Sequence, residues 1–108
     1  MAAQLDEVIA MAEEAVRILK RHADVLAAYV FGSHVDGAPH EDSDLDLAVF
    51  AEGVEELDLV QLARLDRRVH QEVGNAVEVH YFPASAATHS EPASFATYVK
   101  KHGVKLAV

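Results

Sequence analysis

The chain has 108 residues, of which 51% are hydrophobic, and this predicts one folded domain over residues 1–108 rather than a disordered chain. Aspartate and glutamate number 18 against 9 lysines and arginines, so the formal net charge of −9 argues against the basic surface that direct binding to nucleic acid requires. The sequence has no cysteine, no apolar run of about 18 residues and no signal-peptide pattern, so we exclude disulfides and a membrane span and expect a cytoplasmic location.

The first two predicted elements are a helix and a strand. Over residues 5–22, apolar side chains recur at three- and four-residue steps, which gives a helix with one apolar face. Residues 25–31 are almost continuously apolar, as expected of a strand that is covered on both faces. Gly32 then ends this run abruptly.

Two aspartates, Asp44 and Asp46, open the next predicted strand, residues 44–50. Alternate side chains of a strand point to the same face, so these carboxylates project together. Paired carboxylates repel each other, and a divalent cation is the commonest reason for a fold to keep them. The turn before them carries Gly32, which permits close backbone approach, and Ser33, whose hydroxyl and N–H suit a phosphate. The pattern predicts a combined site for a metal ion and phosphate.

The turn and loop between the two strands, residues 32–43, contain His34 and His40. Neither has further candidate ligands at a suitable spacing, so we interpret both as exposed loop residues rather than as metal ligands. A minor role for His40 near a nucleotide stays open, because it precedes the strand with the two aspartates.

A second amphipathic helix is predicted over residues 57–73, with Gly74 as its C-cap and with Arg67 and Arg68 on its solvated side. The third strand, residues 76–82, alternates in character, so that Glu78 and His80 share one face. A loop over residues 83–90 leads to a last helix, about residues 93–102, with Ser90 as candidate cap, Pro92 in the first turn and Gly103 at the end. Residues 104–108 form an apolar tail and a candidate edge strand.

The Gly32-Ser33 pair, ten further residues and Asp44-Leu45-Asp46 together resemble the signature of the DNA polymerase β-like nucleotidyltransferases. The surrounding residues resemble the minimal nucleotidyltransferase (MNT) branch of that superfamily, from about residue 24 to the C-terminus. The resemblance implies the nucleotidyltransferase fold, of class α/β (α+β), with a small mixed β-sheet flanked by helices. The alternative, a Ser-Asp-Leu-Asp turn in an ordinary α/β domain, leaves the Gly-Ser pair and the spacing unexplained.

The resemblance also implies the chemistry and the residues that perform it. Asp44 and Asp46 would bridge two Mg²⁺ ions, and Gly32 and Ser33 would hold the β- and γ-phosphates of ATP. In the family, a third carboxylate comes from the strand beside the Asp-x-Asp strand, and Glu78 stands in that place.

The third carboxylate departs from the family pattern, because the family more often has aspartate where this chain has Glu78. Two other interpretations stay open: Glu78 is a solvent-facing strand residue, or its neighbour His80 tunes the site.

Stand-alone MNT proteins of this kind are commonly paired with a HEPN-domain ribonuclease toxin, to whose tyrosine the MNT antitoxin transfers AMP. The resemblance therefore predicts an adenylyltransferase antitoxin, whose acidic composition suits a basic, RNA-cleaving partner. A binding module that neutralises its partner by contact stays open, as does the catalytic subunit of a nucleotidyltransferase that modifies a small molecule such as an aminoglycoside. Assembly into a homo- or hetero-oligomer also stays open.

Overall fold

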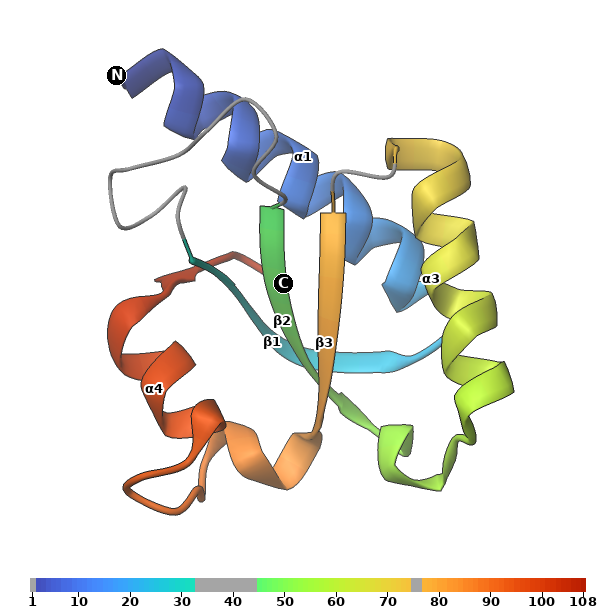
Figure 1. Ribbon diagram of the computed structural model, residues 1–108, viewed down its shortest axis with the longest axis vertical. Helices are drawn as coiled ribbons and strands as arrows, with labels where there is room; N and C mark the ends of the chain where they lie inside the picture. Colours follow the sequence, from blue (N-terminus) through green and yellow to red (C-terminus); the bar gives the residue numbers. More distant parts are fainter. Residues whose placement is uncertain (1, 33–44, 75–76) are drawn as a thin grey trace.

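The computed structural model describes residues 2–32, 45–74 and 77–108, and Figure 1 shows the arrangement of their elements. In chain order these elements are α1 (Ala2–Lys20), β1 (Asp24–Phe31), β2 (Leu45–Glu52), the 3-10 helix η1 (Val54–Glu56), α3 (Leu59–Val73), β3 (Val77–Pro83), the 3-10 helix η2 (Ala84–Ala87), α4 (Phe95–His102) and β4 (Val104–Lys105). Within the described ranges, no helix has the length and apolar character needed to cross a membrane.

The four strands form one mixed sheet in the order β3-β2-β1-β4. β1 is antiparallel to both β2 and β4, whereas β2 and β3 are parallel and are joined through α3. Figure 1 shows β2 and β3 side by side with the same direction. The predicted fold class, a small mixed sheet flanked by helices, is confirmed.

Helices α1 and α3 cover one face of the sheet. Alternate residues of the strands point to this face, and they pack with Leu65 and Val69 of α3 and with the apolar stripe of α1. The exposed side of α3 carries Arg67 and Arg68, as the sequence predicts. These side chains form the larger of two apolar clusters in the core, and it holds β2 and β3, the strands that carry the acidic residues.

The opposite face of the sheet is covered over part of its area by α4 and η2. Ala96 and Val99 of α4 pack against side chains of β1 and β2, with Phe82 of β3 at the edge of this cluster. Phe50 is fully buried, stacks on Phe82 and meets Tyr29 edge-on. The remaining part of this face carries polar side chains of β2 and β3.

Helix starts differ from the sequence-based expectation where capping residues decide them. The second helix begins at Leu59 instead of residue 57, because Asp58 and Gln61 form a reciprocal capping box. The last helix begins at Phe95 instead of residue 93, and its cap is Ser94, whose hydroxyl accepts a hydrogen bond from the N–H of Thr97. The expectation that Ser90 caps this helix, with Pro92 in its first turn, is therefore wrong.

The ends of β1, α3 and α4, at Phe31, Val73 and His102, are where the sequence predicts them, and the remaining described boundaries move by one to three residues. α1 begins at Ala2 and ends at Lys20, and β2 extends to Glu52. The C-terminal tail forms an edge strand as predicted, over Val104–Lys105, and pairs with Tyr29 and Val30 of β1. Gly74 caps α3 with a φ of 112°, a left-handed conformation that glycine adopts readily.

The phenol of Tyr81 on β3 donates a 2.8 Å hydrogen bond to Oδ1 of Asp66 on α3. Burial and this carboxylate raise the pKa of Tyr81 above its usual value of 10.0. Folding therefore favours the neutral phenol. The resulting stabilisation is complete below pH 10.0 and is lost as the pH rises from there towards the higher pKa of the folded state.

We expect Tyr81→Phe to lower the free energy of unfolding by about 1 kcal/mol near neutral pH, because the hydrogen bond to Asp66 is lost. The deficit relative to wild type should shrink above pH 10.0, because phenylalanine cannot ionise. Urea unfolding followed by circular dichroism measures both effects. Tyr98→Phe, at an exposed position of α4, is the control and should match wild type. A deficit that stays constant across this pH range would contradict the role of the Tyr81 phenol.

Candidate active site

The parallel pairing of β2 and β3 places Asp46 and Glu78 directly beside each other. Their Cα atoms are register partners, so the two side chains leave adjacent strands on the same face. Leu45 and Leu47, on either side of Asp46, are buried against the opposite helices and fix the direction of its side chain. Asp46 is 25% exposed at its side chain and Glu78 is 58% exposed, so both carboxylates are accessible from solvent.

Gly32 borders this pair from the end of β1. Its φ is +90°, in the left-handed region that side chains rarely adopt. A Cβ atom at this position would lie only 2.3 Å from Oδ2 of Asp46. Glycine is therefore required twice here, once by the backbone conformation and once by the space that the carboxylate of Asp46 occupies.

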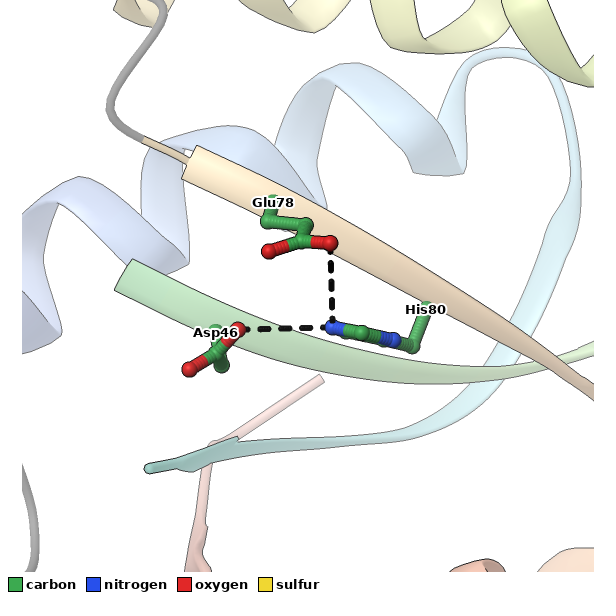
Figure 2. A group of neighbouring side chains, drawn as sticks. All are labelled: Asp46, Glu78 and His80. Carbon is green, nitrogen blue, oxygen red and sulfur yellow. Dashed lines mark hydrogen bonds and ion pairs between the residues drawn. The ribbon is translucent and has the colours of Figure 1, made fainter. Parts of the chain in front are cut away.

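His80 completes the polar cluster, two residues after Glu78 on the same face of β3. Figure 2 shows its ring directed at both carboxylates. Its Nε2 atom lies 3.4 Å from Oδ1 of Asp46 and 4.0 Å from Oε1 of Glu78. The imidazole also contacts the rings of Phe31 and Phe95, at centroid distances of 5.2 Å and 5.8 Å. His80 thus lies at the border between the aromatic and the acidic part of this face.

The structure brings together three of the residues that the sequence singles out near the active centre: Gly32, Asp46 and Glu78. It also brings in His80, which the sequence left as an alternative neighbour. Ser33 and Asp44, predicted to hold phosphate and metal, lie outside the described residues, as do the loop histidines 34 and 40. The catalytic and metal-binding roles of all these residues stay predictions.

Sequence reasoning missed the aromatic side of the cluster. Phe31 ends β1, and Phe95 begins α4, 15 positions after His80. The contact of Phe95 with His80 depends on how α4 packs over the sheet, and the sequence carries no local signal for that packing.

The donor atoms of Asp46, Glu78 and His80 suit a divalent cation. One oxygen from each carboxylate and one imidazole nitrogen all lie within 4.8 Å of one another. Ligand bonds of about 2.0–2.2 Å place two ligands of one ion about 2.8–4.4 Å apart, a range that contains both distances from His80.

A family model described as polymerase β nucleotidyltransferase matches residues 13–105 of the chain. This match includes every described residue of the candidate site. Among curated proteins, none matches the chain.

Solved structures with the same fold include nucleotidyltransferases and a toxin–antitoxin assembly. A protein proposed to be a minimal nucleotidyltransferase is 27% identical, with a TM-score of 0.62, over 94% of this chain and 95% of the other. A proposed nucleotidyltransferase from Sulfolobus solfataricus is 17% identical, with a TM-score of 0.65, over 96% and 83% of the two chains. A toxin–antitoxin structure with AMP-PNP is 22% identical, with a TM-score of 0.54, over 73% and 60%.

The family match covers most of the chain, and the structural likeness extends over nearly all of it. The acidic pair on β2 and β3 lies within the matched region, beside the glycine that ends β1. The chain therefore belongs to the polymerase β nucleotidyltransferase family, as one of its minimal nucleotidyltransferases.

Proposed function

We propose that this protein transfers AMP from ATP, in a Mg²⁺-dependent reaction, to a tyrosine hydroxyl of a HEPN-type ribonuclease toxin and thereby acts as its antitoxin. The observation that carries the enzymatic part is the in-register pair of Asp46 and Glu78 beside Gly32. Such a pair supplies charged oxygen ligands for a divalent cation, and the missing side chain of Gly32 leaves the space that the carboxylate of Asp46 occupies.

Asp46 and Glu78 would hold the cation together with Asp44, which the sequence places two residues before Asp46. When bound, two Mg²⁺ ions would supply positive charge to the attacking and leaving oxygens of a phosphoryl transfer. Gly32 and Ser33 would position the β- and γ-phosphates of ATP.

In the proposed reaction, the acceptor hydroxyl oxygen forms a bond to the α-phosphorus of ATP. The bond between the α-phosphorus and the bridging oxygen to the β-phosphate breaks, and pyrophosphate leaves with its electron pair. Glu78 accepts the hydroxyl proton, a role that its solvent-accessible carboxylate permits. The product is a phosphodiester between AMP and the acceptor.

Two observations support a protein acceptor. A structural neighbour of this chain is a toxin–antitoxin assembly that contains AMP-PNP, an analogue of ATP. The chain itself has a net charge of −9, which favours a basic protein partner over direct contact with nucleic acid. The identity of the partner as a HEPN protein comes from the sequence resemblance. The cytoplasmic location likewise stays a prediction.

Incubation of the purified protein with α-labelled ATP and Mg²⁺ in a lysate of its native host tests the proposal. We expect one labelled protein band, whose mass identifies the acceptor, and no band with an Asp46→Ala/Glu78→Ala variant. A co-expressed HEPN partner should lose its ribonuclease activity only with the active enzyme.

Other outcomes distinguish the alternative functions. If the double variant still neutralises the partner, the protein acts as a binding module, an alternative that glutamate instead of aspartate at position 78 keeps open. A labelled small molecule in place of a labelled protein would identify the catalytic subunit of a small-molecule nucleotidyltransferase.

A further inference from the structure

His80 is held in a fixed place beside the two carboxylates. Phe31 of β1 and Phe95 of α4 contact its ring from two different elements, at centroid distances of 5.2 Å and 5.8 Å. The side chain is 29% exposed, half the value of Glu78. Because aromatic contacts restrict the ring, its Nε2 atom faces Asp46 and Glu78 without any rearrangement (Figure 2).

We propose that His80 is a direct ligand of the cation, together with Asp46 and Glu78, and that its imidazole makes the site favour a transition-metal ion over Mg²⁺. This inference deepens the proposed function and rests on it only in requiring that the site bind a divalent cation. The distances of 3.4 Å and 4.0 Å from Nε2 of His80 to the oxygens of Asp46 and Glu78 are those expected between ligands that share one ion.

The choice of metal follows from the chemistry of the donors. Mg²⁺ prefers oxygen ligands in near-octahedral geometry, and it exchanges its water for a nitrogen ligand reluctantly. First-row transition-metal ions bind imidazole nitrogen more readily. A site with two carboxylates alone would accept Mg²⁺ as well as Mn²⁺, whereas a nitrogen donor adds affinity mainly for the transition metal.

Mn²⁺ is the probe that tests this inference, because it is paramagnetic and reports a bonded nitrogen directly. Electron spin-echo modulation spectra of the Mn²⁺-loaded full chain, recorded without nucleotide, should show a ¹⁴N signal in wild type. The signal should be absent in His80→Asn and present in the control His89→Asn, which changes an exposed histidine on the loop before α4.

Calorimetric titration with each metal alone gives an independent readout. We expect His80→Asn to weaken Mn²⁺ binding by about tenfold or more and Mg²⁺ binding by less than about threefold. Circular dichroism establishes that the variant is folded, and His80→Gln replaces it if it is not. A ¹⁴N signal that persists in either variant would overturn the inference. Equal losses of affinity for Mn²⁺ and Mg²⁺ in either variant would do the same, as would a wild-type protein that binds no Mn²⁺.

Failure of the inference can be told apart from failure of the proposed function. Transfer of AMP by wild type without a ¹⁴N signal would remove His80 from the ligands and leave the enzyme assignment intact. A ¹⁴N signal without transfer under any metal would keep the ligand and refute the transferase.

Discussion

Asp46→Asn is expected to reduce AMP transfer by more than about 100-fold. Loss of a residue that only hydrogen-bonds a metal ligand can cost roughly 100-fold, and Asp46 is proposed to bind the metal directly. Asparagine has nearly the same volume as aspartate but carries no charge, so a direct ligand of the proposed cations loses its negative charge. The fold should persist, because the buried neighbours Leu45 and Leu47 are unchanged and the Asp46 side chain is partly exposed.

Two measurements decide this prediction. Transfer of label from α-labelled ATP gives the activity, and the shift in melting temperature on adding ATP with Mg²⁺ gives binding independently of catalysis. Both should fall in Asp46→Asn, whereas Asp24→Asn, at the exposed start of β1, should behave as wild type. Activity within about threefold of wild type would show that Asp46 does not serve the reaction.

Gly32→Ala is expected to disable the site while costing only moderate stability. The left-handed backbone is strained for alanine by about 1–3 kcal/mol. The new Cβ would also lie 2.3 Å from Oδ2 of Asp46, so the carboxylate must rotate away from its place beside Glu78. We therefore expect a loss of transfer and of metal-dependent ATP binding as large as in Asp46→Asn.

Gly53→Ala separates the two effects of the Gly32 substitution. Gly53 also has a positive φ, +80°, but a Cβ there would meet nothing within 4 Å. This control should show a similar loss of unfolding free energy, measured by chemical denaturation, with near-normal transfer. Equal activity losses in the two glycine variants would mean that backbone strain, and not the contact with Asp46, explains the effect.

The alternation of the strands could be predicted from the sequence, and with it the face that each acidic residue occupies. Asp46 follows the buried Leu45, and Glu78 follows the buried Val77, so period-two patterning was sufficient. That their two strands are neighbours was implied by the family resemblance alone, and the pairing of Asp46 with Glu78 comes from the structure. No local pattern fixes the register of strands that are separated by a whole helix.

Other features depend on tertiary packing or on competition between similar residues. His80 meets Asp46 across 34 positions, and Phe95 reaches His80 only because α4 packs over the sheet. Ser90 and Ser94 are equally plausible caps by residue type. The structure selects Ser94, because its hydroxyl lies within 3.2 Å of the N–H of Thr97.

The parallel pairing of β2 with β3 also links the active site to the folding of the chain. Asp46 and Glu78 are far apart in sequence, so they become neighbours only when this non-local pairing forms, a step with a high loop-closure cost. Their mutual repulsion opposes the same step, because it is small while the strands are apart. Under the proposed function, a bound cation removes this repulsion and stabilises the native state, so the concentration of free metal ion helps to set how much of the protein is folded.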